Sequence, residues 1–599
     1  MEILNKFEER IGKYKTEIAE GKTASQKLSR LRLLAFTVAV SLPVFLLYKK
    51  LSMPALFTFL PLIALFAFLV SRHEAIKKKL IRLEHLEAIN GEYLDRITGK
   101  WHRFQDSGEE WLDPEHPYAA DINLFGKKSL FQLINCAGTY MGRKRLAELL
   151  MDPPESDQAI LGRQKAVSAL SGLTDFRQQL QVEARLMKGP KSNPEPLLSF
   201  LAEGHSQKDP WYVHGLLLFG MPLCTLLYAI LGIVVHPFFY YFLLSLIIIQ
   251  FLLFGLTYGS SSSRLKNLYG YKNQMETYSD IIRRISGENF GEEELNRLKA
   301  FFTGGEYSAA RGLKQLSVLA DCIDMKYGPL LYFLLNAVFL WDLHCLRALN
   351  RWKRENGVKV RAWLEALGEM EALSSLSVVA EINPAVSYAK FAEKGPVFTA
   401  QGLGHIFIPA DKRAVNNVSV KNGIAIITGS NMSGKTTLLR TIGISLVLAY
   451  SGAPVPAESL TLSRMSLYTS MRNTDDLGAG ISTFYAELLR IKKIAERARV
   501  REPMLFLIDE IFKGTNSKDR IEGARRVLKS LVRPWITGLI STHDYELCDL
   551  EKENPLHFEN YHFVETYKDN TIHFDYKLHR GRCTTSNAIY LIKMLGIDE

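Results

Sequence analysis

Four runs without a charged residue dominate the hydropathy pattern of this 599-residue chain. They form two pairs, residues 33–48 with 51–70 and residues 211–235 with 238–258. About 20 apolar residues cross the hydrocarbon core of a bilayer, and three of the four runs reach that length. Only Lys49-Lys50 and His236-Pro237 separate the members of each pair. The pattern predicts two transmembrane helical hairpins, at residues 31–71 and 211–259, each entering and leaving on one side.

Basic residues mark that side for the first hairpin. Nine of them flank it: Lys22, Lys27, Arg30, Arg32, Arg72, Lys77, Lys78, Lys79 and Arg82. Lys49 and Lys50 at the turn oppose this bias, but basic flanks stay in the cytoplasm and the larger group decides. We therefore expect a multi-pass protein of the cell (inner or plasma) membrane with its remaining domains in the cytoplasm. The alternative is that the runs are core helices of a large soluble protein.

The rest of the chain changes character near residue 396. Before it, apolar residues recur mostly at helical spacing, and after it short apolar runs alternate with helical patterns. The short apolar run 330–340 contains Asn336 and predicts a core helix rather than a span. The expected order is an N-terminal helix (1–30), a hairpin (31–71), a helical linker (72–120), a helical core (121–210), a second hairpin (211–259), a second part of the helical core (260–395) and an α/β domain (396–599).

Composition narrows the class of protein. Hydrophobic residues make up 47% and charged residues 23%, as in ordinary folded proteins, which excludes disordered, collagen-like and disulfide-stapled classes. The six cysteines include no CxxC pair, which disfavours a zinc cluster. The net charge of +11 suits nucleic acid or an anionic membrane surface. Because nine basic residues flank the first hairpin, this charge is a weak indication of DNA binding.

A phosphate-binding loop is the strongest motif. Gly429-Ser430-Asn431-Met432-Ser433-Gly434-Lys435-Thr436 fits GxxxxGK[ST], between a short apolar strand (424–427) and an apolar helix that begins at Thr437. Such a loop wraps phosphates with backbone N–H groups at a helix N-terminus. Residues 429–437 are therefore the expected ATP-binding residues. Lys435 would reach the β- and γ-phosphates, and Thr436 would ligate Mg²⁺.

Two further strand ends supply catalytic groups. The apolar run 504–508 ends in Asp509 and Glu510. Asp509 is suited to hold the Mg²⁺ shell, and Glu510 to orient or deprotonate the attacking water. His543 follows the predicted strand 538–541 and could bond the γ-phosphate or that water. A surface loop histidine is the alternative for His543.

A fourth element precedes a helix that contains Glu487 and Ile491. Ser482 and Thr483 lie at its expected N-cap, which makes it a second helix start aimed at an anion. Since the phosphate loop already serves one nucleotide, Ser482 and Thr483 suggest a site completed in trans by another subunit. An ordinary capped helix is the alternative.

Together these elements resemble the MutS family of DNA mismatch-repair ATPases, within the ABC-type ATPase class. The resemblance is carried by residues 428–437, 480–484, 509–516 and 541–544. Residues 121–135, 163–167 and 372–376 resemble the family's helical core and lever, and residues 585–589 its closing helix. The resemblance implies a homodimer with two composite ATP sites, adenine stacking by Phe407, and packing of Tyr576 on the other side of the base.

The chain also departs from the family. We find no mismatch-reading domain with its Phe-x-Glu wedge, no connector domain and no Smr nuclease domain. The second hairpin interrupts the helical core where soluble members extend levers and a DNA clamp. The resemblance to the family therefore does not extend to mismatch recognition.

The predicted fold is an α/β P-loop (ABC-type) ATPase domain preceded by an all-α lever and core domain, with two transmembrane hairpins. The predicted function is a membrane-anchored ATPase that uses ATP and Mg²⁺ in a composite dimer site and binds DNA, in mismatch repair or in sensing another DNA structure. One alternative is an ABC-type transporter, which is disfavoured because the sequence has no LSGGQ-type signature. The other is a membrane scaffold with ATP-gated partner binding. The sequence names no protein partner.

Overall fold

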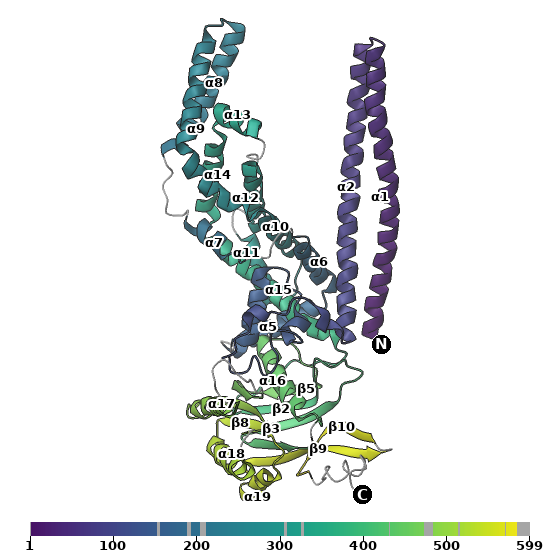
Figure 1. The fold of residues 1–599 in the computed structure, drawn as a ribbon, viewed down its shortest axis with the longest axis vertical. Helices are drawn as coiled ribbons and strands as arrows, with labels where there is room; N and C mark the ends of the chain where they lie inside the picture. The colour runs from purple at the N-terminus through teal and green to yellow at the C-terminus, as the bar shows by residue number, and fades with distance from the viewer. Residues whose placement is uncertain are drawn as a thin grey trace. The chain divides into compact units, whose positions relative to one another are not determined.

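The computed structural model describes residues 2–152, 156–187, 193–203, 211–304, 308–324, 329–430, 432–471, 483–512, 516–568 and 571–583 (Figure 1). The chain forms two compact units. The first unit comprises Met1–Leu133, Val378–Leu446 and Pro454–Glu599, and the second comprises Ile134–Ser377 and Val447–Ala453. A mostly helical N-terminal part is followed by a mixed α/β domain, as the sequence predicts.

The first unit begins with a long antiparallel helix pair, α1 (Glu2–Tyr48) and α2 (Ser52–Ile97). The sequence predicts an N-terminal helix over 1–30 followed by the hairpin, and α1 forms both this segment and the first arm of the hairpin as one helix. The polar ends of the pair are locked together, because the Phe7 ring stacks on Tyr93 at 4.7 Å and Arg10 Nε donates to Asn90 Oδ1 at 3.1 Å. After α2, short 3₁₀ turns at Trp101–Arg103 and Glu109–Trp111 lead to α3 (Leu130–Ile134).

A six-stranded sheet forms the centre of the α/β domain, in the order β10-β9-β4-β8-β7-β6. Its strands are β4 (Ile424–Thr428), β6 (Ser466–Ser470), β7 (Met504–Asp509), β8 (Ile536–Ser541), β9 (Phe558–Lys568) and β10 (Thr571–Arg580). All neighbours pair in parallel except β9 and β10. Every residue of β4, β7 and β8 has a buried or nearly buried side chain, as apolar central strands of a parallel sheet require. Parallel strands therefore bring the ends of β4, β7 and β8 to one edge.

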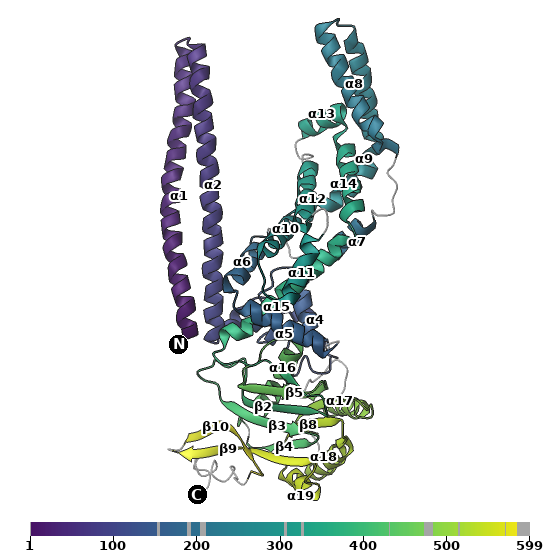
Figure 2. The ribbon, with the colours of Figure 1, turned by 180° about the vertical axis from the view of Figure 1, so that it is seen from behind.

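Helices and a second sheet complete this domain. The helices are α16 (Lys435–Ser451), α17 (Thr483–Arg497), α18 (Ser517–Leu531) and the short α19 (Leu550–Glu553). The second sheet has the order β1-β5-β2-β3, with β1 (Lys390–Phe391), β2 (Val397–Gly404), β3 (Val415–Lys421) and β5 (Ser459–Leu462). Figure 2 shows both sheets from the opposite side.

The second unit is helical. Its helices are α4 (Tyr140–Met151), α5 (Asp157–Ser171), α6 (Thr174–Arg185), α7 (Glu195–Ala202), α8 (Gly215–Val234), α9 (Phe239–Tyr269), α10 (Lys272–Gly287), α11 (Glu293–Thr303), α12 (Ala309–Asp324), α13 (Pro329–Phe339), α14 (Trp341–Asn356) and most of α15 (Lys359–Ile382). The buried Glu371 of α15 fixes the start of α4, because it accepts bonds from the Gly138 and Thr139 amides at 3.0 and 3.3 Å. Helices α8 and α9 form the hairpin that interrupts this unit.

Four of the described helices are long and apolar enough to cross a membrane, judged by length and composition. They are Glu2–Tyr48, Ser52–Ile97, Gly215–Val234 and Phe239–Gly259. A fifth candidate is the pair α13 and α14, which is bent by 77°. These four helices contain the runs that the sequence predicts as hairpins.

Candidate nucleotide site

The loop between β4 and α16 has a backbone that requires glycine at two positions. Gly429 has φ 146° and Gly434 has φ 106°, values that L side chains rarely adopt. A Cβ atom at Gly429 would also lie 3.0 Å from Ser433 Oγ. The side chain of Met432, which has φ 70°, is largely exposed. Asn431 lies outside the described residues. The glycines thus leave an open concave loop directly before the N-terminus of α16.

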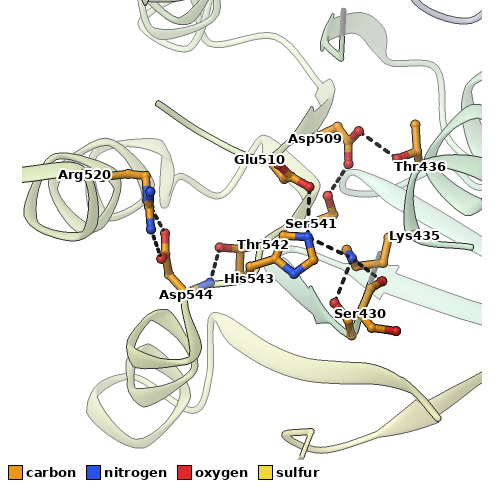
Figure 3. Close-up of polar contacts among 11 residues, drawn as sticks. Ser430, Lys435, Thr436, Asp509, Glu510, Arg520, Ser541, Thr542, His543 and Asp544 are labelled. Atoms are coloured by element: carbon orange, nitrogen blue, oxygen red, sulfur yellow. Dashed lines mark hydrogen bonds and ion pairs between the residues drawn. The ribbon is translucent and has the colours of Figure 1, made fainter. Parts of the chain in front are cut away.

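Lys435 lies in this loop with its ammonium group folded against the backbone (Figure 3). Its Nζ donates to the carbonyl oxygens of Gly429 and Ser430, both at 2.8 Å. The side chain is 5% exposed. Because a buried ammonium is costly without partners, these carbonyls stabilise the charge, and phosphate oxygens could exchange with them.

Asp509 joins three of the elements at the sheet edge. Thr436 Oγ1, in the first turn of α16, donates to Asp509 Oδ2 at 2.7 Å. Ser541 Oγ, at the end of β8, donates to Asp509 Oδ1. The carboxylate is buried and both of its oxygens are bonded. Thr436 and Asp509 therefore present a hydroxyl and a carboxylate side by side, oxygen ligands of the kind that Mg²⁺ prefers.

Glu510 and His543 form a pair beside Lys435. Glu510 has a left-handed backbone (φ 56°), and its Oε1 lies 3.0 Å from His543 Nε2. A hydrogen bond to a carboxylate requires a proton on Nε2. The approach of Lys435 Nζ to the same nitrogen at 3.4 Å is then a close contact and not a second hydrogen bond. The structure thus brings Lys435, Glu510 and His543, the three predicted catalytic residues, to one place.

The turn that carries His543 is anchored on both sides. The Thr542 amide donates to the carbonyl oxygen of Ile427 at 3.0 Å, and the Asp544 amide donates to Thr542 Oγ1 at 3.0 Å. Asp544 also binds both Nε and Nη2 of Arg520, at 2.8 and 2.5 Å. This hydrogen-bonded carboxylate raises the pKa of the Arg520 guanidinium. His543 is therefore held to β4 by backbone and to α18 by a bidentate ion pair.

A cavity of about 490 Å³ opens beside these groups. Its wall includes Ser430, Met432, Ser433, Gly434, Lys435, Thr436, Thr437 and Glu510 from the predicted site, together with Tyr576, His405 and Ile408. Ser433 Oγ is buried without a hydrogen-bond partner, and the ring of Tyr576 lies close to Gly434. An unsatisfied hydroxyl beside an ammonium and a helix N-terminus suits a phosphate-bearing ligand, so the residues present fit ATP with Mg²⁺.

Phe407, which the family resemblance assigns to adenine stacking, does not line the cavity. Phe407 packs against Trp101 and His405, with ring centroids at 5.3 and 5.0 Å, and it is not among the residues that line the cavity. Its neighbour Ile408 lines the cavity instead. The sequence could not reveal this, because Trp101 lies some three hundred positions away.

His405 lines the cavity, although the sequence assigned it no role. Burial, reinforced by Arg413 and Arg440, lowers the pKa of His405 to about 3. Its Nδ1 accepts from the Phe407 amide at 3.2 Å, so the neutral ring carries its proton on Nε2. A neutral donor in the cavity wall can bond a nucleotide without adding charge.

Of the two residues predicted to act in trans, Ser482 lies outside the described residues. Thr483 is the first residue of α17, as expected for a helix start. Further along α17, Glu487 accepts a bond from the Phe512 amide, just after Glu510 in the chain. Helix α17 is thereby tied to the segment that carries the predicted catalytic base.

Asp121 also belongs to the surroundings of this site, although the sequence assigns it to the helical core. Its Oδ2 accepts from Thr469 Oγ1 at 2.7 Å and from the Met471 amide at 3.0 Å. Its carbonyl oxygen accepts from Arg440 Nε of α16 at 3.0 Å. Arg490 of α17 lies 4.0 Å from its other carboxylate oxygen. Asp121 therefore connects β6, α16 and α17. The sequence does not predict these contacts, because Asp121 lies far from those elements along the chain.

No cluster of three or more His, Cys, Asp or Glu side chains suited to a metal ion occurs in the described part of the chain.

Comparison with known proteins identifies the C-terminal domain. Residues 425–599 match the family model of MutS domain V. The chain is 30% identical over 257 residues to a DNA mismatch repair protein MutS of Streptococcus sanguinis, covering 40% of this chain and 29% of that protein. Similar matches are MutS of Aquifex pyrophilus (29% over 241 residues, 39% and 27% covered) and MutS 2 of Halobacterium salinarum (30% over 251 residues, 41% and 28% covered). The chain matches less than a third of each relative's length. The C-terminal part of the chain is thus similar to domain V of MutS proteins.

Proposed function

We propose that this protein is a membrane-anchored ATPase of the MutS type, which binds ATP with Mg²⁺ in the loop after β4 and hydrolyses it in a homodimer. The observation that carries the proposal is the convergence of Lys435, Thr436, Asp509, Glu510 and His543 on one sheet edge beside an open cavity.

ATP binding exchanges internal partners for phosphate. Lys435 would leave the carbonyls of Gly429 and Ser430 for the β- and γ-phosphate oxygens, while the amides of the loop and Ser433 Oγ donate to the same chain of phosphates. Tyr576 and Ile408 offer apolar surface for the base. Thr436 and Asp509 would hold Mg²⁺, which supplies neutralisation of the phosphate charge when bound.

Hydrolysis requires a base next to the γ-phosphate. A water molecule attacks the γ-phosphorus, the bond to the β–γ bridging oxygen breaks, and ADP and phosphate form. Glu510 is suited to accept the proton of the water, and His543, as a donor from Nε2, keeps Glu510 in position before the nucleotide enters. Arg520 and Asp544 act by holding His543.

A second subunit would complete the site. The start of α17, with Ser482 and Thr483, would meet the γ-phosphate bound by the partner, because a helix N-terminus donates amides to an anion. The bond from the Phe512 amide to Glu487 connects that helix to the catalytic segment of its own subunit. Nucleotide occupancy in one subunit could then be sensed by the other.

Membrane attachment and DNA complete the proposal. The four apolar helices support two hairpin anchors, with the rest of the chain in the cytoplasm. The relatives are named DNA mismatch repair proteins, which supports DNA as a partner. Whether the bound DNA contains a mismatch or another structure is a question for binding assays.

The direct test of the site is ATP turnover by the full-length protein in detergent. Glu510→Gln should lower turnover by about 100-fold or more, since a general base contributes roughly 10²–10⁴. Glu522→Gln, an equivalent change on the exposed face of α18, should leave turnover unchanged. Equal turnover in both variants would reject the assignment of Glu510.

Subunit mixing tests the composite site. Lys435→Ala and Ser482→Ala subunits should each be inactive alone, and mixing them should restore part of the turnover because one hybrid site is intact. Failure to recover any turnover while dimers form would reject the composite site but not the ATPase itself.

A further inference from the structure

Helix α13 distributes its side chains in the reverse of the pattern expected in water. Its inward face carries Tyr332 and Asn336, which are 5% and 1% exposed. Its outward face carries Phe333 and Leu334, which are 49% and 59% exposed, and Phe339 in its last turn is 38% exposed. A water-facing amphipathic helix buries the apolar stripe and exposes the polar one. The sequence predicts a core helix here, and the structure instead leaves these apolar side chains uncovered by the chain.

The inward polar groups of α13 are bonded to the start of α14. Tyr332 Oη donates to Asp342 Oδ2 at 2.5 Å, and Asn336 Oδ1 accepts from the Asp342 amide at 3.0 Å. Leu340 between the helices has a left-handed backbone (φ 52°), which makes the 77° bend. Because these polar atoms are satisfied internally, the joint needs no water and is compatible with an apolar environment.

Helix α13 packs on the apolar part of α9. The ring of Phe254 contacts Tyr332 and Phe333 edge-on, at 5.8 and 6.3 Å. Phe254 lies five residues before Gly259, the end of the candidate span, which is about 7 Å inside that end at 1.5 Å per residue. Interfacial helices lie about 5–10 Å deep at the boundary of headgroups and acyl chains. Figures 1 and 2 both show α13 beside the hairpin helices.

Helix α14 holds this arrangement against α8. Pro222 in α8 has no N–H group, so the carbonyl oxygen of Leu218 lacks its usual helical donor. His344 Nε2 lies 3.1 Å from that oxygen and satisfies it. The side chain of Arg347 lies over the Phe219 ring, at 5.6 Å. The hairpin, α13 and the start of α14 are thus linked by contacts within the second unit.

We propose that residues 332–339 lie in the lipid at the membrane interface, where acyl chains cover Phe333, Leu334 and Phe339. This rests on the proposed membrane anchoring. Eleven residues span only about 16 Å, too short for the roughly 30 Å hydrocarbon core, so α13 enters the interface and does not cross. Lipid is the fitting cover because α13 packs on α9, whose candidate span exposes large apolar side chains such as Leu252 and Leu256, and residues 332–341 contain no charge.

Cysteine accessibility tests this placement. The full-length chain, with its six native cysteines replaced by serine, would carry one new cysteine at a time in membrane fragments open on both faces. The test variants are Phe333→Cys and Leu334→Cys. Leu227→Cys in α8, 50% exposed, reports lipid burial, and Val318→Cys (48%) in α12 and Phe301→Cys (49%) in α11 report exposure to water. ATP turnover of each variant verifies folding.

A water-soluble maleimide should label positions 333 and 334 at least about 10-fold more slowly than 318 and 301, and close to the rate at 227, because acyl chains exclude the reagent. All positions should react equally in denaturing detergent. Rapid labelling at 333 and 334 with protection at 227 would overturn the placement of α13 and leave the anchor intact. Rapid labelling at 227 would overturn the membrane anchor itself.

Lipid contact is distinguished from a protein cover by quenching. A bimane fluorophore on Cys-substituted position 333 should be quenched by spin-labelled lipids, and one on position 318 should not. Protection from maleimide without quenching would assign a second copy or another protein to this face and would overturn the proposal.

Discussion

The nucleotide site and the apolar hairpins depart from the usual distribution of side chains in opposite directions. In the site, Lys435 and Asp509 are buried, although charged groups are rarely buried without partners. In the second hairpin, Leu216 and Leu256 are 82% and 83% exposed, although large apolar side chains usually gather inside. The site supplies its own partners, through Gly429, Ser541 and Thr436, whereas these two leucine side chains stay uncovered by the described part of the chain.

The two regions obtain their stability from different surroundings. Buried charges that are fully bonded can be exchanged between internal partners and a ligand, which is the property a nucleotide site needs. Exposed apolar helices require an apolar medium outside the protein. Substitutions that remove a partner in the nucleotide site, or that add a charge to the apolar hairpins, test these two sources of stability separately.

Removal of the buried ammonium should have the largest effect. Lys435→Ala should lower ATP affinity by about 100-fold or more, because losing one member of a buried charged contact costs about 2–5 kcal/mol. Titration with a fluorescent ATP analogue measures this. The exposed Lys421→Ala on β3 is the matched control and should bind normally. Normal affinity in Lys435→Ala would mean that the buried charge serves only the fold.

Addition of a charge to the exposed apolar surface is the converse change. Leu227→Arg in the middle of α8 should reduce membrane insertion, since an arginine at the centre of a span costs about 2.5–3.5 kcal/mol. The fraction of protein that resists carbonate extraction of membranes reports insertion of this hairpin when the first hairpin is deleted. Val318→Arg, at equal exposure in α12, should have no effect. Equal extraction of both variants would contradict lipid exposure of α8.

Asp121 tests whether the surroundings of the site are as closely bonded as its centre. Asp121→Ala removes the acceptor of the Met471 amide and one of the two acceptors of Thr469 Oγ1, which also donates to the Pro117 carbonyl oxygen at 3.1 Å, so the α/β domain should lose about 1–3 kcal/mol of unfolding free energy. Thermal unfolding with and without ATP would detect this. The exposed Asp411→Ala is the control. An unchanged transition would show that water replaces the lost carboxylate.

His405 should give the smallest effect, visible only as a pH dependence. Its pKa is about 3 in the folded protein against 6.5 in the unfolded chain, so the unfolded state binds the extra proton below pH 6.5. Stability should therefore fall with decreasing pH, by up to about 1.4 kcal/mol per unit from this group. His405→Gln lacks that contribution, and its melting temperature should fall less between pH 7 and pH 5. An identical fall in both proteins would mean that His405 is protonated in the fold.

The strand-end residues of the site could be predicted from local sequence motifs. The wall of the cavity could not, because it depends on packing between residues distant in the chain. Residues 429–437, Asp509, Glu510 and His543 each follow a strand, and parallel strands of one sheet must bring their ends together. By contrast, the wall of the cavity depends on partners distant in the chain, as the contact between Trp101 and Phe407 illustrates. The second sheet, with its short strands, carries no strong periodic signal.

The helices show the same division. Four apolar runs were visible because length and composition alone define a candidate span. The outward orientation of α13 was not visible, since it depends on Phe254 and Asp342 as neighbours. The change from polar to apolar residues near residue 31 marks where a candidate span begins and leaves the helical backbone of α1 unbroken.

ATP turnover in a carbonate-washed membrane fraction tests the central claim most directly, because it measures the buried-charge site and the exposed hairpins in one sample. We predict that the turnover of the wild-type chain stays with the washed membranes, falls by about 100-fold or more in Glu510→Gln, and is unchanged in Glu522→Gln. Turnover that is washed off the membranes, or that persists in Glu510→Gln, would contradict a membrane-anchored ATPase.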